Sequence, residues 1–421
     1  MRFELKKSVG LRAAVVAGAL CLGLVIGCHH VDTPDPDPQY TIDQTLSDEA
    51  QRNTIAFDGL GFLTGCLGGQ SFLPPGKVAD FSGFQFLRDN DPTRLGHNTS
   101  FVTIIAFNIL HILSDEQVDR LVASAQEQVS FINSYAYGRF PLMDAFRRQL
   151  EGDIPSGSSG LCRDSVVAYS GRLYEIDGQV SYNRARLMGS ILSSLSSNQS
   201  RALAALKEKN GIGNWDTALA DPLADRQLEP DVKVAVMTYA SEMYSWYAGS
   251  VEADVYFCPE RQGTYFGSFY LKDWPAMGNP NYTIDEQLTA RAGTTFIAAL
   301  VDSQKTLVTG LVDIQRSDLN ALVAAREAIS RELRKFVAGS EADSATVLSL
   351  SRHYGELDGA IVYNYATHFA RVGRSLSEAQ KAKLTSLADS LGYVAPTGAF
   401  LYSRPIPMPE IPNTDFLFGG Q

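Results

Sequence analysis

The sequence has few cysteines, no long apolar run beyond its N-terminus and no excess of positive charge. Its 421 residues hold 36 Lys and Arg against 47 Asp and Glu, and this net charge of -11 argues against nucleic-acid binding, because phosphates would be repelled. None of the short patterns that bind a nucleotide, ligate a protease zinc or present a hydrolase nucleophile occurs. The histidines are dispersed and there is no Cys-x-x-Cys pair. We therefore expect no catalytic residues, no metal, no cofactor and no enzymatic activity.

The scarcity of cysteine also limits disulfide bonding. Of the five cysteines, Cys21 and Cys28 lie at the N-terminus, which leaves Cys66, Cys162 and Cys258. An odd number in an oxidising compartment predicts one disulfide and one buried thiol, but the sequence does not decide which two residues pair.

The first 28 residues follow the pattern of a secretion signal. Basic residues within 2–12 precede an apolar run over 13–27, which is too short to span a bilayer comfortably. The run ends in Leu24-Val25-Ile26-Gly27-Cys28, which resembles a bacterial lipobox. The resemblance implies removal of residues 1–27 and acylation of Cys28, including palmitate. Because His29 rather than Asp follows, it also implies sorting to the outer membrane, on the periplasmic face or at the cell surface. An ordinary signal peptide or a short anchor is the alternative.

Residues 28–47 are expected to act as a tether between lipid and folded protein. Pro and Asp alternate over 31–39, which favours an extended chain. No later segment reaches 18 consecutive apolar residues, so we predict no transmembrane helix.

The remaining chain repeats itself. At a shift of 181 residues, Asp-Gly-x-x-x-Tyr-Asn recurs. Elsewhere, and at a different shift, the segment over 81–89 resembles the one over 265–273. The matched polar residues are Asp177, Tyr182 and Asn183 in the first copy and Asp358, Tyr363 and Asn364 in the second. We predict an internal duplication with two tandem units, 48–257 and 258–421.

Apolar periodicity predicts a mainly α-helical fold. The expected helices span about 98–112, 115–150, 164–193, 197–209, 232–249, 284–310, 316–338, 343–372 and 378–390. The stretches over 56–96 and 250–281 are rich in Gly and aromatics and predict short β-like patches. The tail over 401–412 alternates Pro with apolar residues, so it is not helical. We expect the tail to lie along the protein's own surface, with presentation to a partner as the alternative.

A shorter pattern, Leu-x-x-x-Gln followed by an apolar residue, occurs four times and predicts helix starts. A Ser after the Leu can cap the helix, and the Gln can reach back to the cap residue. The capping residues are Ser114, Gln117, Ser196, Gln199, Gln304, Ser377 and Gln380; at the copy that starts with Leu300, Val301 replaces the Ser. The pattern resembles the LTxxQ motif of the Spy/CpxP-type periplasmic proteins. That resemblance implies an all-helical, cradle-shaped fold and ATP-independent chaperone or envelope-stress function, although this chain is longer and more acidic than the family.

The repeated Asp-Gly-x-x-x-Tyr-Asn has two interpretations. The first is structural: the Asp side chains make local caps or inter-helix hydrogen bonds, and the Tyr rings pack inward. The second is a pair of equivalent ligand or cation sites. On a helix, Asp177 and Tyr182 do not share a face, because five residues turn it by about 500°.

These features predict a membrane-anchored envelope lipoprotein that binds polypeptides. A Spy-like chaperone would expose apolar faces after its four glutamines and would bind unfolded polypeptides. A structural subunit of an envelope or extracellular assembly would hold other envelope proteins. A metal or small-ligand sensor would use the paired Asp, Tyr and Asn residues.

Overall fold

The computed structural model describes most of the predicted helical region. The described residues are 39–40, 46–64, 100–209, 214–248, 263–266, 269–272, 282–285, 293–390, 399–401, 404–406 and 410–419. All of them belong to one unit, Pro36–Gln421. The predicted signal peptide, Cys28, most of the predicted tether, the segment over 81–89, Cys66 and Cys258 lie outside the described residues.

Helices account for most of the described residues, which confirms the mainly α-helical class. They are α3 (Asp48–Thr64), α5 (Ser100–Ile112), α6 (Asp115–Gly138), α7 (Phe140–Glu151), α8 (Arg163–Ser193), α9 (Ser197–Glu208), α10 (Pro230–Ala248), a short helix over 293–298, α12 (Asp302–Thr309), α13 (Leu311–Leu333), α14 (Ser344–Ser375) and α15 (Glu378–Ser390). The described residues also contain the 3-10 turns η2 (Ala224–Arg226) and η5 (Asp415–Leu417).

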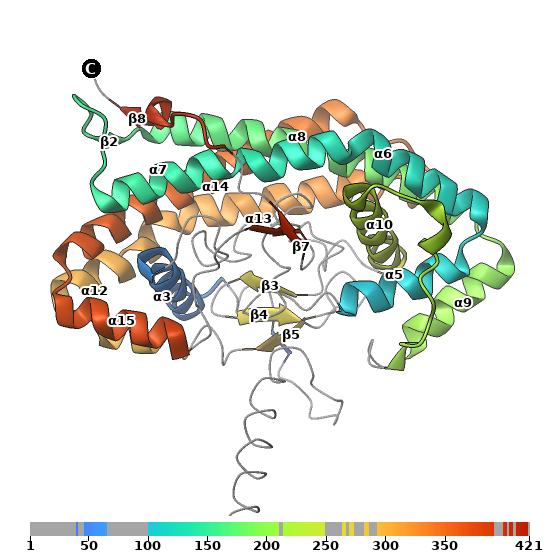
Figure 1. Cartoon of the computed structure of the whole chain (residues 1–421), viewed down its shortest axis with the longest axis horizontal. Coiled ribbons are helices and arrows are strands. Elements are labelled where there is room, and N and C mark those ends of the chain that lie inside the picture. The colour runs from blue at the N-terminus through green and yellow to red at the C-terminus, as the bar shows by residue number, and fades with distance from the viewer. Residues whose placement is uncertain are drawn as a thin grey trace, which may run out of the picture. The chain divides into compact units, whose positions relative to one another are not determined.

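The two longest helices, α8 and α14, pack closely along each other in antiparallel directions (Figure 1). Glycine permits the close approach. A Cβ at Gly355 of α14 would lie 2.6 Å from Tyr174 Cβ and 2.7 Å from the Ser170 carbonyl oxygen. A Cβ at Gly359 would lie 2.9 Å from Val167 Cα. The Gly of the repeated pattern therefore serves helix packing in the second copy.

The other helices contact this central pair in two groups. Helices α6 and α10 contact α8, α10 also contacts α5, and α5 contacts α9. Helices α3, α12 and α13 contact α14, and α15 contacts α3. Figure 1 shows α5, α9 and α10 at one end of the pair and α3, α12 and α15 at the other. The buried apolar side chains form one continuous core that includes Ile55, Leu121, Tyr239 and Phe369.

Short strands join distant segments of the chain. Strand β1 (Gln39–Tyr40) pairs with β5 (Tyr282–Asp285), which pairs with β4 (Phe269–Lys272), which pairs with β3 (Gly263–Phe266), all antiparallel. Two further antiparallel pairs are β2 (Gly160–Leu161) with β8 (Phe418–Gly419), and β6 (Ala399–Leu401) with β7 (Arg404–Ile406). The predicted β-like patches over 250–281 therefore contain β3 and β4.

Two predicted helices are interrupted. The predicted helix over 115–150 breaks between α6 and α7, where Gly138 and Arg139 precede Pro141 in the first turn of α7. Proline has no N–H to donate back to the preceding turn, so a new helix starts there. The predicted helix over 284–310 begins with β5 and breaks again before α12, because the third Leu-x-x-x-Gln copy starts a separate helix.

Helix α3 was not predicted, and the expectation of β-like patches over 56–96 is wrong for residues 56–64, which are helical. Its sequence contains Gly59 and Gly61, which weaken the local helical signal. At Gly59 a Cβ would lie 2.9 Å from the Phe369 ring of α14. Tertiary packing on α12–α15 therefore explains both the helix and its glycine.

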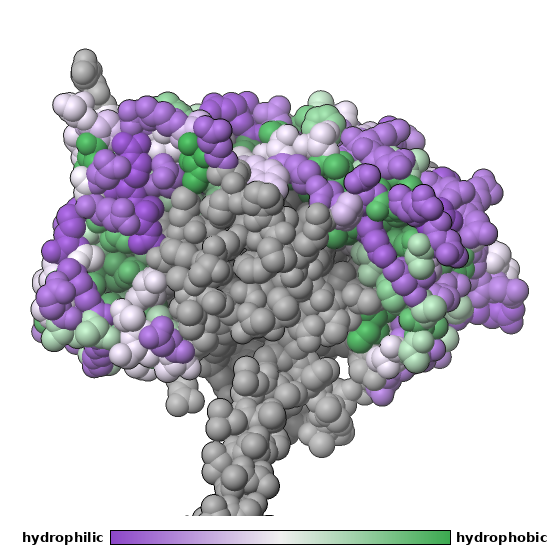
Figure 2. Space-filling model, in the orientation of Figure 1, coloured by the Kyte–Doolittle hydropathy of each residue, from purple (hydrophilic) through white to green (hydrophobic). Residues whose placement is uncertain are grey.

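Most of the described surface drawn in Figure 2 is hydrophilic, with smaller hydrophobic areas between the helices. Among the described helices, none combines the length and the hydropathy required to cross a membrane.

Candidate functional site

The Leu-x-x-x-Gln copies lie at four helix starts. At α6, the Ser114 N–H donates to Gln117 Oε1 (2.9 Å), and the Gln117 N–H donates to Ser114 Oγ (3.3 Å). The same reciprocal pair recurs at α9 and α15, between Ser196 and Gln199 and between Ser377 and Gln380. At α12 the Val301 N–H donates to Gln304 Oε1 (3.0 Å), but Val301 has no side-chain oxygen to accept the return bond.

The first two glutamines also bond to each other across helices. Gln199 Nε2 donates to Gln117 Oε1 (2.7 Å) and to the carbonyl oxygen of Ile112, the last residue of α5 (2.9 Å). Gln117 Nε2 donates to Oγ of Ser194, the residue after α8 (3.0 Å). These bonds join the starts of α6 and α9 to the ends of α5 and α8.

The other two glutamines make the corresponding contacts. Gln380 Nε2 donates to Gln304 Oε1 (2.8 Å) and to the carbonyl oxygen of Ala299 (3.0 Å). Gln304 Nε2 donates to Ser375 Oγ at the end of α14 (3.1 Å). We call the pairs Gln117–Gln199 and Gln304–Gln380 the glutamine clasps. Sequence reasoning found these residues as caps but did not predict that they pair.

The apolar residues that follow the four glutamines are buried. Each of them has an exposed fraction of 0%: Leu121, Leu203, Val308 and Leu384. The expectation that apolar faces are exposed directly after the glutamines is therefore wrong at these positions. The clasps bring four helix starts together in two pairs, and each pair places these residues in the core.

The aspartates of the repeated pattern lie inside the helical core. Asp177 on α8 and Asp358 on α14 are 2% and 1% exposed. Asp358 Oδ2 lies 3.7 Å from Arg139 Nη1 and 3.5 Å from Ser170 Oγ, which donates to it. A buried carboxylate requires such partners, because desolvation of an uncompensated charge is costly.

Two buried arginines share this region. Arg139 Nη1 donates to the Tyr174 hydroxyl (3.0 Å), and Arg326 Nη1 donates to the Tyr354 hydroxyl (3.3 Å). The two tyrosine rings meet edge to face with centroids 5.0 Å apart. We call these residues, with the neighbouring Tyr135 and the two aspartates, the central polar cluster: Tyr135, Arg139, Tyr174, Asp177, Arg326, Tyr354 and Asp358.

Within the central polar cluster, the electrostatics favour a charged Arg139 and a neutral Tyr174. Burial disfavours the charge of Arg139, but the oxygens of Tyr174, Tyr135 and Asp358 raise its pKa above the ordinary value. Burial, followed by the charge of Asp358, raises the pKa of Tyr174 well above its ordinary value. Sequence reasoning missed both arginines. The available signal was the position of Arg326 on the apolar stripe of α13, in helical register with Leu322 and Ile329.

The Tyr and Asn residues of the repeated pattern contact groups other than the two aspartates. The Tyr182 hydroxyl donates to the Ala342 carbonyl oxygen (3.3 Å), and Asn183 Oδ1 accepts from Gln179 (3.2 Å). Tyr363 packs against the core, and the carbonyl oxygen of Asn364 lies 2.8 Å from His368 Nδ1. These contacts agree with the structural interpretation of the pattern.

In the described ranges, no three His, Cys, Asp or Glu side chains are grouped to hold an ion. Cys162 is a free thiol, and a hydrogen bond with Ser165 lowers its pKa.

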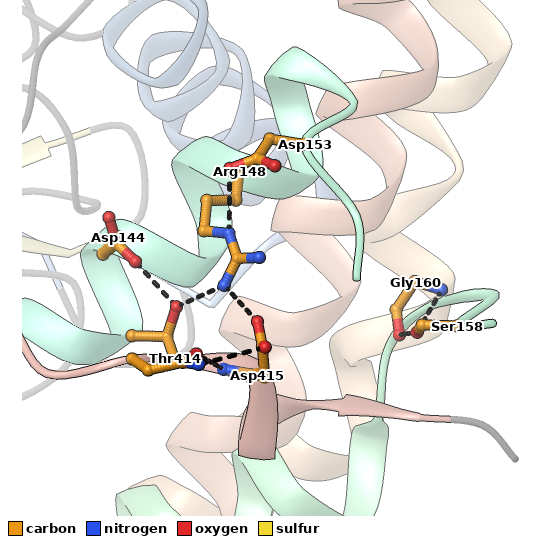
Figure 3. Close-up of polar contacts among 8 residues, drawn as sticks. Asp144, Arg148, Asp153, Ser158, Gly160, Thr414 and Asp415 are labelled. Carbon is orange, nitrogen blue, oxygen red and sulfur yellow. Dashed lines mark hydrogen bonds and ion pairs between the residues drawn. The ribbon is translucent and has the colours of Figure 1, made fainter. Parts of the chain in front are cut away.

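The C-terminal segment over 410–419 docks on α7 and α8 (Figure 3). Arg148 Nη1 donates to Asp415 Oδ1 (2.8 Å) and to Thr414 Oγ1 (3.0 Å), and Arg148 Nε donates to Asp153 Oδ2 (3.1 Å). Thr414 Oγ1 in turn donates to Asp144 Oδ2 (2.7 Å). These contacts belong to residues that follow the predicted tail over 401–412; within that tail, Ile411 packs against the core.

Main-chain pairing completes this docking site. The Cys162 N–H donates to the Leu417 carbonyl oxygen (2.8 Å), and the Ser159 N–H donates to the Gly419 carbonyl oxygen (3.2 Å). Leu417 is fully buried, and the Arg148 guanidinium lies 4.9 Å from the centre of the Phe418 ring. One arginine thus contacts a carboxylate, a hydroxyl and an aromatic face of the same segment.

Comparisons with protein-family models, curated proteins and solved structures find no match to this chain.

Proposed function

We propose that this chain is a lipid-anchored protein of the bacterial outer membrane that serves as a structural component and holds another envelope polypeptide at a fixed interface. The N-terminal lipobox pattern supports the anchor. The observation that carries the structural role is the full burial of Leu121, Leu203, Val308 and Leu384. An unfolded-polypeptide chaperone needs exposed apolar surface, and the structure gives these four residues to the core instead.

We further propose that the helical body arose by duplication, with unit boundaries revised to begin at α3 and α10. A shift of 181 residues aligns α3 with α10, α8 with α14, and α9 with α15. Buried apolar residues coincide at this shift, as at Ile55 with Val236 and Phe62 with Met243. The matching contacts of the two glutamine clasps support the same relationship. The boundary between the two units, expected at residue 257, would instead lie just before α10, which begins at Pro230.

With these boundaries, each unit gives its first helix to the other. Helix α3 contacts α12, α13, α14 and α15 of the second unit, whereas α10 contacts α5, α6 and α8 of the first. Separation of the units would expose the apolar faces of both exchanged helices. This interlocking favours a rigid structural component over a chaperone whose helical body opens to admit unfolded polypeptides.

A ligand-sensing role finds less support. The carboxylate of Asp358 already has Arg139 and Ser170 beside it, and both aspartates are buried. A thermal melt that is unchanged across a panel of divalent cations would end the sensor hypothesis.

Chemical cross-linking in native envelopes, followed by purification of this chain, tests the structural proposal. We expect one partner polypeptide at constant stoichiometry, and Cys28→Ala should release the protein from the membrane fraction. The competing chaperone role predicts that residues 40–421 suppress aggregation of an unrelated unfolded protein at near-stoichiometric ratio without ATP. Suppression, together with many cross-linked clients, would overturn the proposal.

A further inference from the structure

Every copy of this chain carries both the C-terminal segment over 410–419 and the docking site that binds it. Arg148 binds the Asp415 carboxylate, Asp144 accepts from Thr414, and Leu417 is buried on the body. The segment thus offers an acidic, an apolar and an aromatic residue in fixed order to a site with a matching cation and apolar surface.

Many contacts between the segment and its docking site do not require that both belong to the same molecule. Strand β8 adds to β2 with Gly160 opposite Gly419 and Leu161 opposite Phe418. The Ser158 hydroxyl donates to the Gly419 carbonyl oxygen as well. Hydrogen bonds of this kind form equally well with the same segment from another molecule, which is the physical basis of strand exchange.

The segment also docks away from the helix that precedes it. It follows α15, which contacts α3, but it docks on α7 and α8. The connection over 391–409 contains Pro405, Pro407 and Pro409, and proline does not continue a helix. The docked segment is therefore not a continuation of α15, which ends at Ser390.

We propose that this site on α7 and α8 also takes the C-terminal segment of a second copy, so that neighbouring copies join by exchange of residues 410–419. A tethered segment competes at an effective concentration in the millimolar range, so exchange needs a high local density of copies. The inference goes beyond the proposed function, because it does not depend on the lipid anchor or on an envelope partner.

The native Cys162 permits a direct test. A Cβ at Gly419 would lie 3.2 Å from Cys162 Cβ and 3.8 Å from Cys162 Sγ, and Cβ atoms joined by a disulfide are about 3.8 Å apart. The lowered pKa of the Cys162 thiol favours the reactive thiolate. In one mature chain, with Cys28→Ser for solubility, Gly419→Cys should form an intramolecular disulfide with Cys162 under mild oxidation. If this link does not form, the docked geometry and the proposal both fail.

Exchange is measured with two chains, both carrying Cys28→Ser. The donor carries Gly419→Cys and Cys162→Ser, so it cannot link to itself at this site. It also carries Arg148→Asp, which weakens its own site and frees its segment. The acceptor is isotope-labelled and keeps Cys162 and Arg148. Peptide mapping by mass spectrometry at high protein concentration should find the donor's introduced thiol joined to the acceptor's Cys162.

Asp415→Asn in the donor is the matched control. It removes the charged partner of the acceptor's Arg148 from the donor segment alone, while the acceptor's own segment is unchanged, and should lower the yield of linked chains about tenfold or more. Intermolecular linking that is lost with this variant supports exchange. The proposal is overturned by an intramolecular link without any intermolecular link after prolonged oxidation, or by an intermolecular yield that is unchanged in Asp415→Asn. Circular dichroism verifies that each chain is folded.

Discussion

At the scale of single residues, the unusual feature is a set of buried charges between packed helices. Arg139 and Asp358 are 5% and 1% exposed, and their atoms come within 3.7 Å. Burial of an ion pair is not strongly stabilising by itself, but loss of one partner leaves the other charge uncompensated. The pair therefore specifies how α7 and α14 meet more than it adds to stability.

Asp358→Ala should lower the free energy of unfolding by about 3–5 kcal/mol, because it leaves the Arg139 charge buried without its carboxylate. The double variant Arg139→Met with Asp358→Leu should recover most of that loss. Urea denaturation measures both values, and Asp302→Ala, an exposed site, serves as the control. A loss for Asp358→Ala within about 0.5 kcal/mol would contradict the assigned interaction.

At the scale of elements, two devices set the helix arrangement: the glycine contacts between α8 and α14, and the glutamine clasps at the helix ends. Both join elements that are distant in the sequence. Each depends on a few glycines or glutamines, whose own secondary-structure preferences do not predict these contacts.

Gly355→Ala should destabilise the protein by about 1–3 kcal/mol through overpacking against Tyr174 and the Ser170 carbonyl. In a helix, alanine is more favourable than glycine by about 1 kcal/mol. A net loss of stability in Gly355→Ala would therefore come from packing. Ser349→Ala, exposed on the same helix, should have little effect. A melting temperature that rises in Gly355→Ala would show that α8 and α14 do not approach closely there.

Gln380→Ala should lower the unfolding free energy by about 1–2 kcal/mol, because it removes half of a capping box and leaves the Ala299 carbonyl without this donor. Gln126→Ala, at an exposed position of α6, is the control. Equal denaturation midpoints for Gln380→Ala and Gln126→Ala would mean that the glutamine clasp adds no more stability than an exposed side chain.

At the scale of the whole molecule, the exchanged helices α3 and α10 and the docked C-terminal segment join parts that are far apart in the chain. Elements that share one core unfold together. The described body should therefore behave as one cooperative unit.

Calorimetry of the soluble chain should record one unfolding transition, with calorimetric and van't Hoff enthalpies in agreement. Two resolved transitions would mean that the proposed units fold independently and that the exchanged helices contribute little.

Docking of the C-terminal segment should weaken in acid. A hydrogen bond from Arg148, followed by one from Asn413, lowers the pKa of Asp415. A lowered carboxyl pKa contributes stability that is present above its ordinary value of about 3.9 and is lost as the pH falls through the folded-state value. Limited proteolysis by an acid-active protease should cut the segment increasingly below about pH 4. Asp415→Asn should be cut to a similar extent at all pH values, and a pH dependence equal to that of the unmodified chain would exclude this role of Asp415.

The sequence by itself determined the helical class, most helix positions and four helix starts, because apolar periodicity and capping hydrogen bonds involve residues a few positions apart. Helix α3 escaped prediction because Gly59 and Gly61 weaken the local signal, and only packing on the second set of helices compensates for them. The same limit applies to Arg139 and Arg326, whose burial depends on tyrosines and aspartates that approach when helices pair. Likewise, Gln117 and Gln199 are recognisable as caps, but their mutual bond exists only once α6 and α9 begin side by side. Tertiary structure decided these contacts, because the energy of a buried charge or amide depends on the groups that remote segments place beside it.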